Sequence, residues 1–228
     1  MGPKRVRLVV RALSELCVTG GTLILLFVVY LLYWTSVRAD QAMDGEIDHL
    51  QDRWAAGPVA AAAEPAPRPR RYESGASFAI MYIPRLGADW AKPVLQGTKA
   101  ATLRKGLGHY AGTARLGATG NFAVAGHRRT YGDPFKDFPR LSPGDAVVLS
   151  DGTTWYTYRI TGRPHRTLPT DVGVIDPVPR ASGFRAPGRY LTLTTCEPEW
   201  GHSHRLIAWA HLDATQSVAQ GKPKALYS

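Results

Sequence analysis

The chain has 228 residues, 44% of them hydrophobic and 20% charged, and a formal net charge of +10 at neutral pH. This length holds one domain of ordinary size plus appendages and excludes a chain of several full-sized domains. Its 17 prolines and 23 glycines provide for many turns and favour a β-rich domain.

The N-terminal segment has the pattern of a membrane anchor. Four basic residues lie within the first 11 positions, and no charged residue occurs in the 22 positions from Leu16 to Val37. As a helix this run spans about 33 Å, enough to cross the ~30 Å hydrocarbon core of a bilayer. The positive-inside rule keeps residues 1–15 in the cytoplasm and sends the chain after the anchor at 16–37 outside. A cleaved signal peptide is the alternative, but the run exceeds a typical h-region and no convincing cleavage site follows it.

Residues 38–75 are expected to connect the anchor to the domain. Apolar residues from Met43 to Trp54 recur at helical spacing, so the membrane helix is expected to continue outward as a stalk. A solvated helix is a simpler expectation than a dimerising one. The segment at 57–71 is rich in alanine and proline and is predicted to be a linker, because it cannot bury enough apolar surface to fold alone.

From Ser77 onward, short runs of β-forming residues alternate with turns that contain glycine and proline. The predicted strands cover residues 78–83, 93–95, 121–126, 146–150, 155–161, 172–175, 190–195 and 205–212. We expect a glycine-rich loop at 106–120, a surface loop or short helix at 130–141, and a polar, frayed tail at 214–228. Six to eight short strands with few helices indicate a closed barrel or a sandwich, within a domain placed at 76–213.

The domain and its tail are strongly basic. Residues 76–228 contain 19 Lys and Arg against 10 Asp and Glu. Such a surplus is compatible with nucleic acid binding, but the outward topology argues against it and favours an anionic lipid surface or a cell-wall polymer. A solvated basic surface is the simplest alternative.

A thiol and a guanidinium stand at neighbouring ends of the last two predicted strands. Cys196 directly follows the strand at 190–195, and Arg205 begins the next strand. A hairpin would place both side chains at the same end of the sheet. Cys17 lies in the predicted anchor and leaves Cys196 without an intramolecular disulfide partner. On these grounds a catalytic thiol and a buried structural cysteine explain Cys196 equally well.

His127 directly follows the apolar strand at 121–126. A cysteine nucleophile needs a partner that manages its proton, and a cation or amide that holds the developing oxyanion. His127 and Arg205 supply those two types of group. A papain-like peptidase also combines cysteine and histidine, but there the thiol begins a helix and precedes its histidine, whereas Cys196 ends a strand and follows His127.

At these residues the sequence resembles the sortases, most closely class E sortases. The segment LTLTTC at 191–196 is followed by Arg205 nine residues after the cysteine, and NFAVAGHR at 121–128 is followed by YGDPF at 131–135. The resemblance runs from about residue 77 to residue 212. It implies a mainly β fold, an eight-stranded sortase-type barrel with short helices, preceded here by the single transmembrane helix.

The resemblance implies a transpeptidase that uses no cofactor. Cys196 would attack the threonine carbonyl of a sorting signal, His127 would protonate the leaving glycine amine, and Arg205 would hold the substrate and the oxyanion. An amine, usually of a cell-wall precursor, would then resolve the acyl-enzyme. The implied partners are secreted proteins with a C-terminal sorting signal and that amine, and the implied location is the cell membrane of a Gram-positive bacterium, with the catalytic domain outside.

The resemblance also bears on the substrate-binding residues. Thr194 and Thr195 precede the thiol in the family motif and are expected to shape the strand end. Tyr110 matches a class E tyrosine associated with choosing Leu-Ala-x-Thr-Gly over Leu-Pro-x-Thr-Gly, although a tyrosine in such a loop can also be a packing anchor. Glu197 departs from the family pattern, which has histidine or another neutral residue there. A carboxylate beside the thiol disfavours the thiolate, so lowered reactivity is expected unless Arg205 or exposure offsets it.

Metal binding is not expected. Cys196, His202 and His204 fit no common structural zinc spacing, and the loop at 106–120 lacks the acidic residues that calcium needs. Two functions of other classes stay open: an inactive sortase-like module that binds the wall, and a thiol redox sensor.

Overall fold

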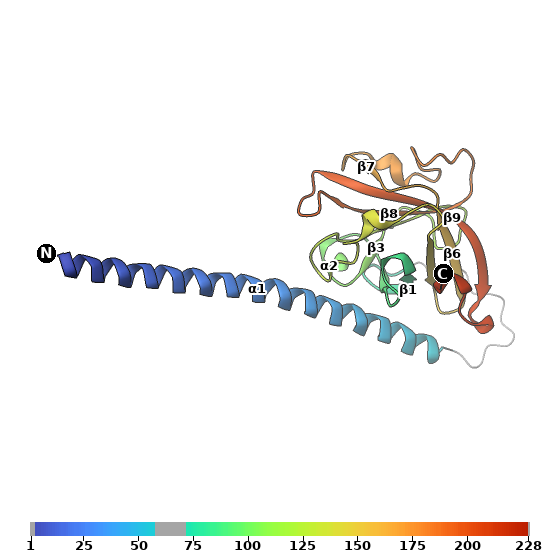
Figure 1. Ribbon diagram of the computed structural model, residues 1–228. Helices are drawn as coiled ribbons and strands as arrows, with labels where there is room; N and C mark the ends of the chain where they lie inside the picture. Colours follow the sequence, from blue (N-terminus) through green and yellow to red (C-terminus); the bar gives the residue numbers. More distant parts are fainter. Residues whose placement is uncertain (1–2, 58–71, 228) are drawn as a thin grey trace.

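The computed structural model describes residues 3–57 and 72–227 (Figure 1). α1 (Pro3–Ala55) is one continuous helix, so the expected anchor and stalk form a single element. Within it, Pro3–Tyr30 is long and apolar enough to cross a membrane and is not buried against the rest of the molecule. The predicted linker at 57–71 lies outside the described residues, apart from Gly57.

The chain after the linker forms a β-barrel. Its strands are β1 (Ser77–Tyr82), β2 (Ala91–Gln96), β3 (Leu107–His109), β4 (Gly120–Ala125), β5 (Ala146–Ser150), β6 (Thr154–Ile160), β7 (His165–Thr167), β8 (Arg189–Glu197) and β9 (His204–Ser217). The sheet order is β6-β5-β1-β2-β3-β4-β8-β9-β7, and β6 also pairs with β9. That pairing closes eight strands into a barrel and confirms the expected fold, while β7 extends the sheet along the first residues of β9.

Two of the strand pairs are parallel, β2 with β3 and β4 with β8. The pairing of β4 with β8 matters for the site, because the residues that follow two parallel neighbouring strands lie at the same end of the barrel. The helices of the barrel domain are short. They are α2 (Ala100–Leu103) and the 3-10 helices Pro84–Leu86, Phe138–Arg140, Val172–Ile175, Val218–Gln220 and Lys224–Leu226.

Alternate side chains of the strands fill the barrel interior, as the two-residue period of a strand requires. The core includes Val94 of β2, Phe122 and Val124 of β4, Leu191 and Leu193 of β8, and Ala208 and Ala210 of β9. On β8 and β9 the intervening residues therefore point to the outer face of the sheet. Cys196 shares the outer face with Thr192 and Thr194, because the three are two residues apart.

The predicted strand at 172–175 is wrong, because Val172–Ile175 is a 3-10 helix. Val174 packs against Ile207 and Trp209 on the outer face of β9. Trp209 donates its Nε1 proton to the carbonyl oxygen of Val174 at 3.0 Å. Four apolar residues can bury one side as a helical turn as well as a strand, so the run alone does not distinguish the two.

Other segments expected to be irregular are ordered. β3 lies inside the expected glycine-rich loop, and β7 is a short, polar strand outside the predicted set. The segment at 130–141 contains one 3-10 turn, but Phe135, Phe138 and Leu141 are fully buried, so it is anchored in the core and does not lie only on the surface.

The expectation of a frayed tail is also wrong. β9 continues to Ser217 and pairs with β6, so the expected domain end at residue 213 falls within a strand. Beyond it the chain turns back over the barrel, where Ala225 is buried against Ala146 and Trp155. These apolar residues lie on the outer face of β5 and β6, and the tail removes them from water.

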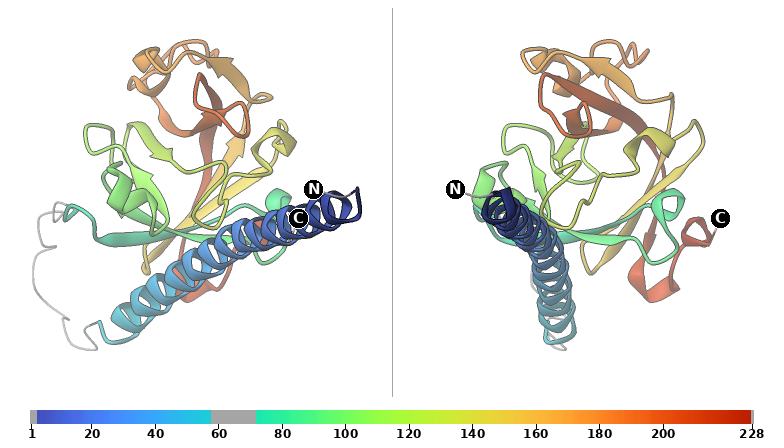
Figure 2. Two further views of the ribbon diagram at one scale, coloured as in Figure 1. Left: turned by 90° about the vertical axis from the view of Figure 1, so that its left-hand side faces the viewer. Right: turned by 60° about the vertical axis from the view of Figure 1, so that its left-hand side comes forward.

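The stalk is a helix, as expected, but it is not simply solvated. Met43 and Leu50 are fully buried, and this part of α1 packs on β1 and β2. Both views of Figure 2 show α1 passing along one side of the barrel. The helical spacing of its apolar residues is the same for a free amphipathic helix and a docked one, so the sequence pattern could not separate the two.

Candidate active site

The β8–β9 hairpin places the thiol and the guanidinium opposite each other. Cys196 of β8 is in register with Arg205 of β9. Directly opposed residues of an antiparallel pair share a face, with Cβ atoms about 5 Å apart. The Nη1 of Arg205 donates to the carbonyl oxygens of His202 (3.0 Å) and His204 (2.9 Å). The loop backbone thus holds the guanidinium at the end of the hairpin, on the side of the thiol.

The parallel pairing of β4 and β8 brings the histidine to the same place. Ala125 is in register with Thr194, and His127 and Cys196 each follow two residues later. Beyond the paired residues, Gly126 donates its backbone N–H to the carbonyl of Thr194 at 3.1 Å. Thr195 donates its hydroxyl to the carbonyl of Gly126 at 2.8 Å. These two hydrogen bonds fasten the residue before His127 to the residues before Cys196.

The imidazole of His127 is partly buried. Its Nε2 is buried and has no hydrogen-bond partner among the described residues. The ring of Tyr131 lies 5.2 Å from the His127 ring, centroid to centroid. Burial lowers the pKa of His127 below its ordinary value, and the positive charge of Arg104 lowers it further. The imidazole is therefore neutral at neutral pH and able to accept a proton.

Two arginines directly after His127 bind two carboxylates that follow Cys196. Arg128 forms an ion pair with Glu197, and only 9% of the Arg128 side chain and 23% of the Glu197 side chain are exposed. Arg129 binds Glu199 at 2.9 Å. These contacts join the segment that carries the histidine to the segment that carries the thiol.

The pairing changes the interpretation of Glu197. Adjacent residues on a strand point to opposite faces, so the Glu197 carboxylate is directed away from the face of the Cys196 side chain. It binds the guanidinium of Arg128 instead. From the sequence, Arg205 is the group expected to offset this carboxylate, whereas in the structure Arg128 does so. The available signal was the pair of arginines after the histidine, opposite two glutamates after the cysteine.

The three expected substrate-binding residues lie on β8 before Cys196 or contact that strand there. The hydroxyl groups of Tyr110 and Thr194 are 3.0 Å apart, and Thr194 stands two residues before Cys196 on the same face of β8. Tyr110 is partly exposed, whereas Thr194 and Thr195 are only 4% and 2% exposed. The threonines therefore brace the strand end, and Tyr110 is the one of the three that offers surface to a ligand.

Within the described residues no group of three or more His, Cys, Asp or Glu side chains is placed to hold a metal ion. Nδ1 of His204 accepts a hydrogen bond from Nη2 of Arg166 at 3.1 Å.

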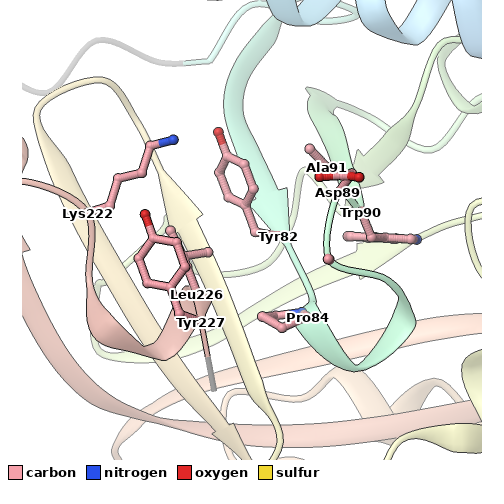
Figure 3. A pocket seen from close by; sticks show the side chains of 9 residues that line it. Tyr82, Pro84, Asp89, Trp90, Ala91, Lys222, Leu226 and Tyr227 are labelled. Atoms are coloured by element: carbon pink, nitrogen blue, oxygen red, sulfur yellow. The ribbon is translucent and has the colours of Figure 1, made fainter.

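A separate cleft of about 670 Å³ lies between the β1–β2 connection and the C-terminal tail (Figure 3). Tyr82 and Trp90 line it from one side, and Lys222, Leu226 and Tyr227 line it from the other. It contains none of the candidate catalytic side chains, so its size does not make it the reaction site.

The chain is similar to proteins of one known family. A family model described as a sortase domain matches residues 81–213. The chain is 40% identical to sortase SrtE1 of Streptomyces coelicolor over 96% of its own length, and it spans 61% of the length of that relative. It is 32% identical to sortase SrtE2 of the same organism, covering 92% of this chain and 84% of SrtE2.

Two solved structures are also similar. Sortase E from Streptomyces avermitilis is 70% identical, with a TM-score of 0.65, covering 68% of this chain and 99% of that one. Sortase E1 from Streptomyces coelicolor, described with a tripeptide in the active site, is 40% identical with a TM-score of 0.64, covering 67% of this chain and 97% of that one.

Proposed function

Because the chain belongs to the sortase family, whose members are cysteine transpeptidases, we propose that it cleaves a sorting signal between threonine and glycine and joins the threonine to a cell-wall amine. The observation that supports the proposal is the strand register, which brings the three residues to one end of the barrel. Cys196 and Arg205 are in register across β8 and β9, and His127 follows the strand parallel to β8.

The first half of the reaction forms a thioester. The sulfur of Cys196 attacks the threonine carbonyl carbon, and the thiol proton passes to the neutral imidazole of His127. The N–H groups of Arg205 stabilise the oxyanion of the tetrahedral intermediate. As the intermediate collapses, the C–N bond breaks, and His127 returns the proton to the leaving glycine amine.

The second half releases the product. An amine attacks the thioester carbonyl and gives a proton to His127, the C–S bond breaks, and the proton returns to the sulfur of Cys196. The product is a new amide at the threonine. If water replaces the amine, the same steps yield a free carboxylate and the overall reaction is hydrolysis.

The proposal places the catalytic domain outside the cell membrane on a single-pass anchor. The apolar part of α1 supports this location, because Pro3–Tyr30 is sufficient to span a bilayer and basic residues precede the apolar run. The partners in this proposal are secreted proteins that carry the sorting signal and the amine of a wall precursor. The exposed part of Tyr110 beside Thr194 supports a role in the choice between Leu-Ala-x-Thr-Gly and Leu-Pro-x-Thr-Gly.

Turnover of both peptides by the full chain in detergent, with and without candidate amines, tests the proposal. Cys196→Ala is expected to remove cleavage, while the matched variant Cys17→Ala, which alters the cysteine of α1, retains it. Cleavage by the Cys196→Ala variant would overturn the enzyme assignment. A thiol-reactive substrate analogue separates this function from a redox sensor or an inactive module, because labelling of Cys196 by the enzyme requires His127 and Arg205.

A further inference from the structure

The last part of α1, residues 39–55, is docked on the barrel, and we call it the docking segment. Ala39, Met43 and Leu50 are 7%, 0% and 1% exposed, and their spacing places them on one face of the helix. They meet β1 and β2. The apolar span of α1 is not buried in this way, since its described large apolar side chains from Leu8 to Tyr30 are exposed.

Polar contacts fix the position of the docking segment. Ser77 of β1 donates its hydroxyl to Oε1 of Glu46, and Arg53 donates to the backbone carbonyl of Ser77 at 2.9 Å. Lys92 of β2 binds Asp40 at 3.4 Å, with only 15% of the Lys92 side chain exposed. Hydrogen bonds and ion pairs require a particular geometry, which apolar contacts do not. These polar contacts therefore hold the helix at one position along the barrel.

The contacts follow a definite order along the helix. At its start, a Cβ on Gly132 would overlap Cε of Met43 and Oδ1 of Asp40. At its end, a Cβ on Gly152 would overlap the ring of Trp54. Asp40 and Trp54 are fourteen residues apart, or about 21 Å along the helix axis. The barrel therefore lies lengthwise against the docking segment.

The end nearer the apolar span is the end that carries the candidate site. Gly132 belongs to the loop that follows β4 and contains His127, whereas Gly152 lies in the β5–β6 turn. In Figure 1 the tip of the β8–β9 hairpin lies on the side of the barrel toward the N-terminal half of α1. In the left view of Figure 2, the hairpin tip and the N-terminal end of α1 both come toward the viewer.

We propose that the docking segment holds the barrel with the candidate site facing the bilayer at a fixed height, so that the enzyme acts on peptides tethered close to the membrane surface. This inference rests on the proposed function and on the proposed anchoring. Asp40 is only three residues beyond Val37, the last residue of the uncharged run. The loop of His127 is thereby on the order of 10 Å from the edge of the apolar layer.

A tethered-substrate assay tests the orientation. The full chain is reconstituted in lipid vesicles with a Leu-Ala-x-Thr-Gly peptide that carries a palmitoyl-lysine at its C-terminus, after a flexible spacer of 6, 12 or 24 residues. Cleavage rates are divided by each variant's own rate on the untethered peptide. With the barrel held at a fixed height, fourfold spacer lengthening dilutes the peptide at the site, and the relative rate is expected to fall by about two- to fourfold. A barrel freed from α1 samples a range of heights, so its relative rate is expected to depend much less on spacer length.

Two sets of variants separate orientation from folding. Met43→Asp with Leu50→Asp undocks the helix and is expected to give the flatter profile. Ala42→Asp with His49→Asp adds two carboxylates at neighbouring, exposed positions and is expected to keep the wild-type profile. Insertion of seven helix-forming residues after Val37 raises the docked barrel by about 10 Å and is expected to shift the best spacer from 6 to 12 residues.

The outcomes distinguish the two proposals. If the wild type fails to cleave the untethered peptide, the proposed function fails. If all variants cleave the untethered peptide and share one spacer profile, the proposed function stands and the orientation is refuted. A flat profile in the undocked variant only, together with the shift on insertion, supports the orientation.

Discussion

The ion pair between Arg128 and Glu197 offers a quantitative test of how the site is assembled. Only 9% of the Arg128 side chain is exposed, so Glu197→Gln leaves a buried guanidinium without its partner. Breaking a buried pair in this way costs about 3 to 5 kcal/mol, and we expect about 3, because 23% of the Glu197 side chain reaches solvent. Arg128→Gln is expected to cost less, about 1 to 2 kcal/mol, since water can hydrate the more exposed carboxylate.

The assay is urea unfolding of the barrel in the full chain in detergent, followed by tryptophan fluorescence. In the double variant Arg128→Gln/Glu197→Gln no charge is left unpaired, so the loss is expected to be smaller than the sum by about 1 to 3 kcal/mol. The neighbouring pair is the control: Glu199 is 41% exposed, so Glu199→Gln is expected to cost less than about 1 kcal/mol. Additive losses for Arg128 and Glu197, within about 0.5 kcal/mol, would refute the pairing.

The same variants test the electrostatic role of Glu197 at the thiol. If the carboxylate is neutralised by Arg128, the double variant is expected to be alkylated at Cys196 by a small neutral reagent within about twofold of the wild-type rate at pH 7. Arg128→Gln alone, which leaves the carboxylate unpaired, is expected to slow the reaction. Equal acceleration in the double variant and in Glu197→Gln would show instead that Glu197 restrains the thiol by itself.

Three further predictions concern the pH dependence, the guanidinium and calcium. Burial lowers the pKa of His109 to about 4. Below pH 6.5 the unfolded chain therefore binds more protons than the folded chain, and stability is expected to decrease as the pH is lowered, by about 2 to 3 kcal/mol between pH 7 and 4.5. Unfolding curves at the two pH values should show this loss, and His109→Gln should remove the part of it that His109 contributes. Arg205→Lys is expected to lower kcat at least 100-fold in peptide turnover, because a single ammonium cannot bind two loop carbonyls and an oxyanion at the same time. A near-normal kcat would contradict the role of Arg205 in stabilising the oxyanion. Calcium or a chelator is expected to leave turnover unchanged, and activation of several-fold would reveal a site that the acid-free loop at 106–120 does not suggest.

Much of the barrel could be predicted where strands are long and apolar. The runs in β4, β5, β8 and β9 combine β-forming residues with clear stops, and their predicted positions agree with the structure to within a few residues, except that β9 runs five residues further. β3 and β7 have three residues each and no apolar pattern, and neighbouring strands hold them in the sheet. Val172–Ile175 is the opposite case. Its apolar run predicts a strand, but in the structure the segment packs on the outer face of β9 and does not join the sheet.

The candidate site divides in the same way. Cys196, His127 and Arg205 could be selected from their residue types and their order, with the resemblance deciding between a catalytic and a structural thiol. The contacts that align them could not, because they join residues far apart in the chain. Arg128 and Glu197 are 69 positions apart, and Met43 and Gly132 are 89 apart. Such pairs depend on the closed barrel and on the docking of α1, neither of which a local pattern encodes.

Trapping of the acyl-enzyme tests the central claim most directly. The full chain is mixed with a Leu-Ala-x-Thr-Gly peptide without an acceptor amine, quenched in acid within one turnover, digested and analysed by mass spectrometry. We predict that the fragment containing Cys196 gains the mass of the peptide up to threonine less one water, and that hydroxylamine removes it. A peptide cleaved between threonine and glycine with no adduct on Cys196, or an adduct on another residue, would contradict the account.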